Sequence, residues 1–267
     1  MNMFNEFLHA TASSQSNSVQ SYICNNHKVW LKKASKRHGG WIYWPLQWFS
    51  RLLGLHMLAP VPNLGGEKSI ACEVSRLTQL RQLGINVPEL LAADAQALLI
   101  KDAAGDAGEV KQLEGALAEA TSSQQRLDLY QHAILAIEQI HAKDTYLSEA
   151  FARNILIDQA QNFSFIDFET DPGQYLSLKD CQTRDWLCFI FSTARFFEME
   201  ELPQVQNMLS QVLEKHPGIF QDVCRVGKKL KWVLKLKPEA LGSDGRRMSK
   251  CIHLLTGLNL QQPLPMI

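Results

Sequence analysis

Two short apolar runs near the middle of the chain carry an asparagine and an aspartate in positions that suit metal binding. The run NILID covers residues 154–158 and the run FSFIDFE covers residues 163–169, with the turn QAQN between them. An acid inside an apolar strand is costly to bury unless a cation or hydrogen-bond donors compensate it. Amide and carboxylate oxygens suit Mg²⁺, which bridges the phosphates when ATP donates a phosphoryl group. We therefore predict a hairpin in which Asn154 begins the first strand, Asp167 lies within the second, and both face one cation. The alternative is an Asp167 that only caps a turn.

The hydrophobic pattern predicts the elements that position this hairpin. A first hairpin is expected over residues 18–34, with its turn at Asn25-Asn26 and two lysines at its end. An amphipathic helix is expected from residue 67 to Gly84. The other expected elements are strands at 88–92 and 97–100, a helix with loops between 109 and 124, and helices at 125–142 and 180–197. Residues 1–18, rich in Ser and Asn, are expected to form a loosely ordered start.

Composition indicates a folded globular protein. The chain has 267 residues, 46% of them hydrophobic and 20% charged, with a formal net charge of zero. The net charge therefore provides no electrostatic attraction to nucleic acid, and we expect no nucleic-acid partner. The six cysteines form no CxxC pair and are interpreted as reduced core thiols of a cytoplasmic protein. No signal peptide is apparent at the N-terminus.

The order of the motifs resembles the protein-kinase-like superfamily, and within it the bacterial lipopolysaccharide core kinases that act on Kdo and heptose. The run VWLKKASKRHGGW is followed by an apolar segment and by ACEVSRLTQLRQLGINVPELLAA, then by IHAKDTYLSEAFARNILID and FSFIDFE. The resemblance covers residues 19–195 and rests on order and spacing more than on any single motif. It implies an α+β, two-lobed fold with a small mostly-β N-terminal lobe at residues 1–102. A larger helical C-terminal lobe would follow at residues 103–267.

The resemblance also implies roles for single residues. Lys32, with Lys33 as the fallback, matches the lysine that holds the α- and β-phosphates of ATP. Glu73 matches the helix glutamate that forms an ion pair with this lysine. Asn154 and Asp167 match the two ligands of Mg²⁺. The pattern alone leaves open that Lys32, Lys33 and Glu73 are ordinary solvated residues.

Two further residues match positions that support the catalytic loop. Asp185 matches an aspartate that braces the backbone of this loop, although an exposed acid in a first helical turn is an equal alternative. His141 matches a histidine at a helix end that packs under the loop, and its expected role is structural.

The catalytic loop departs from the family pattern. The family has an aspartate five residues before the asparagine and a histidine two residues before that aspartate. Glu149 and Leu147 occupy these positions here. The longer side chain of glutamate moves its carboxylate by about 1.5 Å. Such a shift can lower the rate of a reaction that depends on precise positioning by on the order of 100-fold. Glu149 is therefore either a replacement base or the mark of an inactive enzyme.

Two regions next to the catalytic loop also differ from the family pattern. No Gly-x-Gly-x-x-Gly precedes Lys32, so backbone amides from residues 10–20 are the expected cover for the phosphates. The metal motif reads Asp-Phe-Glu where protein kinases have Asp-Phe-Gly, and we give this difference little weight.

The most apolar stretch of the chain, residues 41–60, is expected to add a helix at 46–58 to the N-terminal lobe. Its Trp44, Trp48 and Phe49 follow a basic segment that ends at His38. Aromatic residues beside basic ones suit a bilayer interface, which would place the protein peripherally on the inner membrane. Packing across the N-terminal lobe as core is the alternative.

These observations favour an ATP- and Mg²⁺-dependent phosphotransferase that acts on a hydroxyl, with a lipopolysaccharide core sugar or an envelope glycolipid as acceptor. Asp167 and Glu149 are its expected catalytic residues. The alternative is a pseudokinase that binds nucleotide or a partner and regulates envelope assembly. A small-molecule kinase of the aminoglycoside type is disfavoured, because such enzymes keep the loop aspartate.

Overall fold

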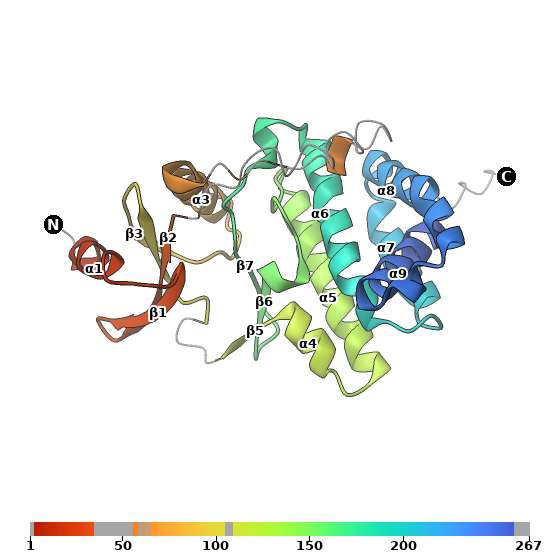
Figure 1. Cartoon of the computed structure of the whole chain (residues 1–267), viewed down its shortest axis with the longest axis horizontal. Coiled ribbons are helices and arrows are strands. Elements are labelled where there is room, and N and C mark those ends of the chain that lie inside the picture. Colours follow the sequence, from red (N-terminus) through yellow and green to blue (C-terminus); the bar gives the residue numbers. More distant parts are fainter. Residues whose placement is uncertain are drawn as a thin grey trace.

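The structure is a computed structural model that describes residues 3–34, 56–58, 61, 63, 65–104 and 109–258. It has two parts (Figure 1): a small lobe built on one antiparallel sheet and a larger lobe that is mainly helical. The prediction of an α+β fold, with a small sheet lobe first and a larger helical lobe after it, is confirmed.

The small lobe contains a four-stranded antiparallel sheet in the order β1-β2-β4-β3. Its strands are β1 (Val19–Cys24), β2 (His27–Lys33), β3 (Leu90–Ala93) and β4 (Ala97–Lys101). The turn between β1 and β2 is formed by Asn25 and Asn26 with φ of 50° and 62°. Asparagine is one of the few residues that tolerate this left-handed conformation, which the tightest hairpins require. The predicted hairpin and its turn are confirmed.

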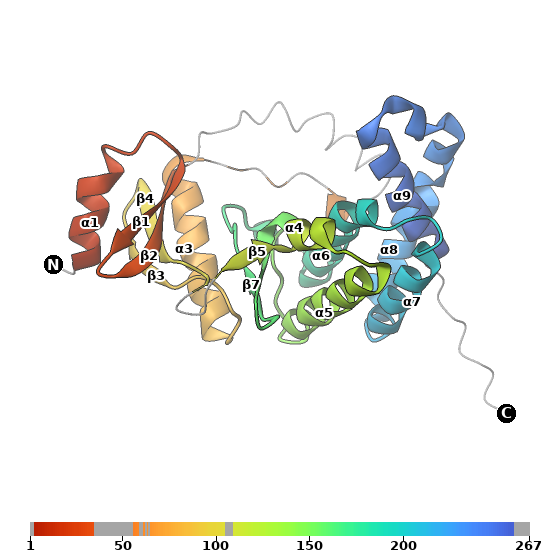
Figure 2. The ribbon, with the colours of Figure 1, turned by 90° about the horizontal axis from the view of Figure 1, so that it is seen from below.

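Two helices flank this sheet on opposite sides (Figure 2): α1 (Met3–Ala12) and α3 (Gly66–Gln82). Leu8 of α1 is fully buried in a cluster with Val29 and Leu31 of β2. The prediction of a loosely ordered start is therefore wrong for residues 3–12, because their apolar side chains cover one face of the sheet. The helix predicted from residue 67 to Gly84 is confirmed as α3.

The larger lobe contains a second antiparallel sheet in the order β5-β6-β7. Its strands are β5 (Val110–Gln112), β6 (Ile155–Asp158) and β7 (Phe163–Phe165). The α-helices are α4 (Leu113–Glu119), α5 (Ser123–His141), α6 (Leu178–Thr193), α7 (Leu202–Leu213), α8 (Pro217–Leu230) and α9 (Ser243–Gly257). Short 3-10 helices lie at Ala152–Asn154, Pro172–Gln174, Ala194–Phe196, Lys231–Leu236 and Pro238–Leu241, and His56–Leu58 forms another.

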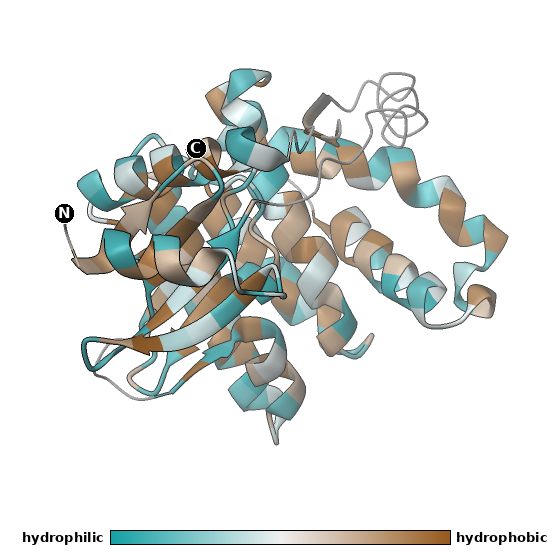
Figure 3. Cartoon of the chain, turned by 60° about the vertical axis from the view of Figure 1, so that its left-hand side comes forward, coloured by the Kyte–Doolittle hydropathy of each residue, from teal (hydrophilic) through white to brown (hydrophobic). Residues whose placement is uncertain are grey.

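The core of the larger lobe lies where α5 and α6 meet the helices that follow. Tyr130 of α5 packs against Phe189 and Phe197, with ring centroids 5.1 Å apart in both pairs. Hydrophobic and hydrophilic residues alternate along these helices (Figure 3), as expected where one face packs inward and the other meets water. This core holds α5, α6 and the second sheet as one platform beneath the cleft between the lobes.

Several sequence predictions fall outside the described residues or remain untested. The apolar helix expected at 46–58 lies outside the description except for His56–Leu58, which form a 3-10 turn. The division at residues 102 and 103 stays a prediction; the first sheet ends at Lys101 and the second begins at Val110. Among the helices that the structure describes, none has both the length and the apolar character that a membrane crossing requires.

Candidate active site

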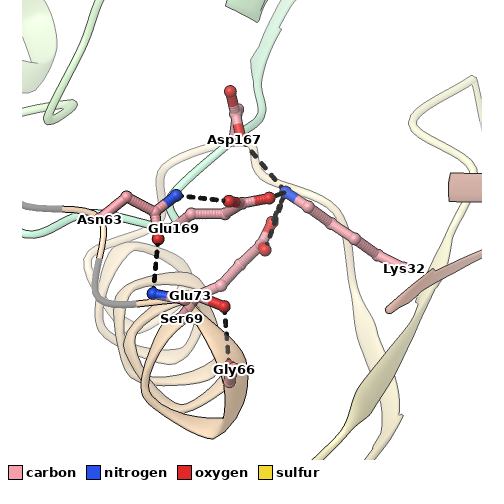
Figure 4. Close-up of polar contacts among 8 residues, drawn as sticks. Lys32, Asn63, Gly66, Ser69, Glu73, Asp167 and Glu169 are labelled. Carbon is pink, nitrogen blue, oxygen red and sulfur yellow. Dashed lines mark hydrogen bonds and ion pairs between the residues drawn. The ribbon is translucent and has the colours of Figure 1, made fainter. Parts of the chain in front are cut away.

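Lys32 lies at the centre of a cluster of carboxylates between the two lobes (Figure 4). Its Nζ is 2.9 Å from Glu73 Oε2, 3.1 Å from Asp167 Oδ1 and 2.9 Å from Glu169 Oε1. Glu73 belongs to α3, whereas Asp167 and Glu169 follow β7. One ammonium group thus joins the sheet and helix of the small lobe to the larger lobe.

The local sequence explains why these groups meet. Lys32 shares a face of β2 with Trp30, because successive strand residues point to opposite sides. Glu73 lies on α3 among buried positions that include Ile70 and Leu77, so the helix presents it inward. Its side chain is only 3% exposed and would be costly to bury without Lys32. Lys33, the fallback, donates to the carbonyl of Gln15 at 2.9 Å and is not among the described residues that line this cleft.

The charges of this cluster shift the ionisation of its members. Burial alone would lower the pKa of Lys32, but attraction from Glu73, Asp167 and Glu169 raises that pKa above its ordinary value. Burial raises the pKa of Glu73, and the nearby Lys32 opposes this rise. Lys32 is therefore cationic at neutral pH, and the carboxylates around it leave an excess of negative charge that a further cation would balance.

Asp167 lies beyond the end of β7 and not within the strand, which corrects the sequence prediction. It has a left-handed backbone with φ of 73°. Phe168 next to it is fully buried and anchors the turn in the core. The amide of Ile166, the residue before Asp167, donates to the carbonyl of Asn154 at 3.0 Å, so the backbone next to one expected metal ligand is bonded to the other. A non-glycine residue with positive φ is strained, and such strain often occurs at functional sites.

Asn154 ends the 3-10 turn Ala152–Asn154 just before β6, again slightly displaced from the prediction that it begins the strand. Its Nδ2 donates to the carbonyl of Glu149 at 3.1 Å, which leaves the Oδ1 end of the amide for a ligand. Asn154 and the 42%-exposed Asp167 line the same cleft. One amide oxygen and one carboxylate fit Mg²⁺, which takes few protein ligands and completes its shell with phosphate oxygens and water.

The loop before Asn154 is fixed by a buried charge. Asp185 of α6 is fully buried, and its Oδ2 accepts the backbone N–H of Leu147 at 2.6 Å and lies 3.0 Å from His141 Nε2. Ser148, which follows, has φ of 77° and is also fully buried. Asp185 is therefore not an exposed first-turn acid. It braces this loop, and His141 supports it from the end of α5.

Glu149 occupies the position of the expected base, but its carboxylate has a partner. Its Oε1 lies 2.9 Å from Nη2 of Arg184, whose Nη1 donates to the carbonyl of Met57 at 3.3 Å. The described lining of the cleft includes Asn154 and Asp167 but not Glu149. The pair with Arg184 holds the Glu149 carboxylate and occupies one of its oxygens.

The part of the cleft that contains Lys32 has a volume of about 580 Å³. Apolar side chains enter that part from both lobes, with Ile100 on one side and Leu156 and Ile166 on the other. Trp30 also lines it, and its indole N–H donates to Asp102 Oδ1 at 2.8 Å. This part of the cleft combines apolar walls with a few polar groups, Lys32, Asn154 and Asp167 among them, as is typical of small-molecule sites. Of residues 10–20, the expected phosphate cover, Val19 lines this part of the cleft.

Sequence reasoning missed Glu169 and Asn63. Glu169 carries a direct contact with Lys32, and its Oε2 accepts the Nδ2 of Asn63 at 2.9 Å. The Oδ1 of Asn63 accepts the backbone N–H of Gly65, directly before α3. The change from glycine to glutamate in the Asp-Phe-Glu motif was the available signal for Glu169. No local pattern indicates the contact from Asn63.

Comparisons with known proteins do not assign this chain to a family. No protein-family model matches the chain, and no curated protein matches it. Among solved structures, the bifunctional kinase-methyltransferase WbdD is similar at 15% sequence identity and a TM-score of 0.34. The match covers 89% of this chain and 42% of that one, so this chain spans less than half of that protein. Function is therefore inferred from the geometry of the site and from the sequence motifs.

Proposed function

We propose that this protein is a kinase that transfers a phosphoryl group from ATP, with Mg²⁺, to a hydroxyl of a sugar. The observation that supports this most is the position of Lys32, held within 3.1 Å of Glu73 and Asp167 in a cleft that Asn154 also lines. The four residues come from β2, α3 and the two ends of the second hairpin, which lie far apart in the sequence.

Each residue has a distinct part in the proposed reaction. Lys32 binds phosphate oxygens of ATP, and Glu73 keeps its ammonium group in place. Asn154 and Asp167 hold Mg²⁺, which when bound supplies positive charge to the phosphates. The acceptor oxygen forms a bond to the γ-phosphorus as the bond to the bridging oxygen breaks, and ADP leaves with that electron pair. Glu149 orients the acceptor hydroxyl and receives its proton.

The acceptor proposed from the motif resemblance is a lipopolysaccharide core sugar or a related envelope glycolipid. Such an acceptor is held at a membrane, so we propose a cytoplasmic protein in peripheral contact with the inner membrane. The aromatic and basic residues of segment 36–49 support this membrane contact. They lie outside the described residues, so this support comes from the sequence alone.

A pseudokinase that binds nucleotide without transfer is the second candidate. The ion pair between Glu149 and Arg184 favours it, because one oxygen of the expected base is already occupied. In this case Lys32, Asn154 and Asp167 still bind MgATP, and the protein regulates envelope assembly through its nucleotide state.

One set of assays separates the two candidates. Purified protein is incubated with labelled ATP, Mg²⁺ and de-acylated core oligosaccharide, and the phosphorylated sugar is measured. A kinase transfers phosphate, and Glu149→Gln lowers kcat by on the order of 100-fold or more, since a positioned base contributes about 10²–10⁴-fold. MgATP binding without transfer favours the pseudokinase. A Glu149→Gln variant as active as the parent removes Glu149 as the base, and no nucleotide binding contradicts both candidates.

A further inference from the structure

A second hollow lies beside the carboxylate cluster, between α3 and residues 169–175, and we call it the α3 hollow. Its volume is about 430 Å³, within the usual range for small-molecule sites. Glu169 lines both the α3 hollow and the part of the cleft that contains Lys32. A ligand in the hollow would therefore lie next to the carboxylate cluster around Lys32.

The walls of the α3 hollow offer unused hydrogen-bonding groups. Ser75 projects from α3, and Thr170 and Gln174 project from the opposite wall. Among the hydrogen bonds of the described residues, none uses the side chains of these three. Hydroxyl and amide groups can each donate and accept, which matches the hydroxyl groups of a sugar.

An exposed aromatic ring completes the site. Tyr175 lines the α3 hollow and is 58% exposed. Covering so large an aromatic ring is favourable, so an exposed ring is available to a ligand. One face of a saccharide ring carries mainly C–H groups and packs well on an aromatic face, while its hydroxyls point to the rim. The ring of Tyr175 and the polar groups around it therefore suit the two kinds of surface that a sugar presents.

The two walls of the hollow are firmly joined to each other. Arg76 of α3 stacks on the ring of Tyr146 at 4.2 Å and donates to the Tyr146 carbonyl at 2.6 Å. The Tyr146 hydroxyl donates to Asp171, which also accepts the N–H of Gly173 at 3.1 Å. A Cβ on Gly173 would overlap the Tyr146 hydroxyl, so a larger residue there would have to displace this ring. A site with fixed walls loses less entropy when it binds a ligand.

We propose that the α3 hollow binds a sugar ring of the acceptor of the proposed kinase, next to the ring whose hydroxyl reacts. Tyr175 packs against the C–H face of the sugar ring, and Ser75, Thr170 and Gln174 bond its hydroxyls. This inference rests on the proposed function, because the hollow shares Glu169 as a wall with the part of the cleft that contains Lys32. Holding the hydroxyl beside the phosphate converts an encounter into a positioned reaction.

The test uses the full chain with two changes in the hollow and one matched control. Tyr175→Ala removes the platform, and Tyr175→Phe keeps it. Ser75→Trp fills the hollow from an exposed position of α3. The matched control is Gln82→Trp, which places the same ring on an exposed position of α3 outside the hollow. Binding of de-acylated core oligosaccharide is measured by calorimetry in the presence of a non-hydrolysable ATP analogue and Mg²⁺, and thermal unfolding confirms that each variant is folded.

The expected result is an approximately tenfold weaker oligosaccharide Kd for Tyr175→Ala, which corresponds to about 1.4 kcal/mol. Ser75→Trp abolishes this binding, whereas Tyr175→Phe, Gln82→Trp and the parent bind alike. The Kd for the ATP analogue stays unchanged in every variant. Oligosaccharide binding that survives both Tyr175→Ala and Ser75→Trp overturns the site, and a parent that binds the ATP analogue but no oligosaccharide overturns the saccharide assignment. Failure of the parent to bind the ATP analogue contradicts the proposed function instead.

Discussion

Replacing Lys32 by methionine should destabilise the protein in a way that depends on pH. The substitution removes the cation from Glu73, whose side chain is 3% exposed. Breaking a buried ion pair by removing one partner costs about 3–5 kcal/mol. Asp167 and Glu169 add less to this cost, because their side chains are 42% and 20% exposed and water solvates them.

The pH dependence follows from Glu73. Burial already raises its pKa, and without Lys32 the main opposing influence is gone. A carboxyl whose pKa is higher in the folded state binds more protons folded than unfolded, so stability falls as pH rises through that interval. Lys32→Met should therefore lose about 3–5 kcal/mol at pH 8, and much less as the pH approaches the unfolded pKa of about 4.3.

Urea unfolding of the parent, Lys32→Met, Glu73→Gln and the double variant at pH 5 and pH 8 measures this effect. The double variant carries no unpaired charge at this position and should recover most of the loss at pH 8. A Lys32→Met deficit that is equal at both pH values, or a double variant no more stable than Lys32→Met, would refute the reasoning.

Three other predictions concern the parts that support the site. Asp185→Asn weakens the hydrogen bond from the Leu147 amide and should lower the free energy of unfolding by about 1–3 kcal/mol, measured with urea. A change within experimental error would mean that Asp185 does not brace the loop. Leu8→Ala opens a cavity beneath α1 and should cost about 2–5 kcal/mol in the same assay, whereas a negligible loss would show that α1 does not pack as described. Arg184→Gln releases the Glu149 carboxylate and should lower kcat on the order of tenfold while the KM for ATP stays unchanged; an unaltered or higher kcat would show that the pair does not position Glu149.

The periodic elements of the fold could be read from the sequence because their signals are local. The Asn25-Asn26 turn between two apolar runs predicts the first hairpin, and the stripe that ends at Gly84 predicts α3. The signal for α1 was also local, since Phe4, Phe7 and Leu8 recur at helical spacing. The Ser- and Asn-rich residues that follow obscured it.

The contacts of the site could be predicted only in part. The glutamate at 73 could be placed beside the apolar stripe of α3, but its partner lies 41 residues earlier and is not fixed by any local pattern. After β7 the chain changes direction at Asp167, whose backbone is left-handed, and Glu169 then reaches Lys32. The contact of Glu169 with Lys32 depends on that turn, and a strand pattern gives no sign of it.

The most direct test of the account is the binding of ATP with and without Mg²⁺, measured by calorimetry on the parent, Asn154→Ala and Asp167→Asn. The account predicts that the parent binds ATP tightly only with Mg²⁺, that EDTA removes this gain, and that both variants lose it while they unfold at temperatures close to that of the parent. ATP binding that is indifferent to Mg²⁺, or a Mg²⁺-dependent gain that both variants retain, would contradict a metal and nucleotide site at these two residues.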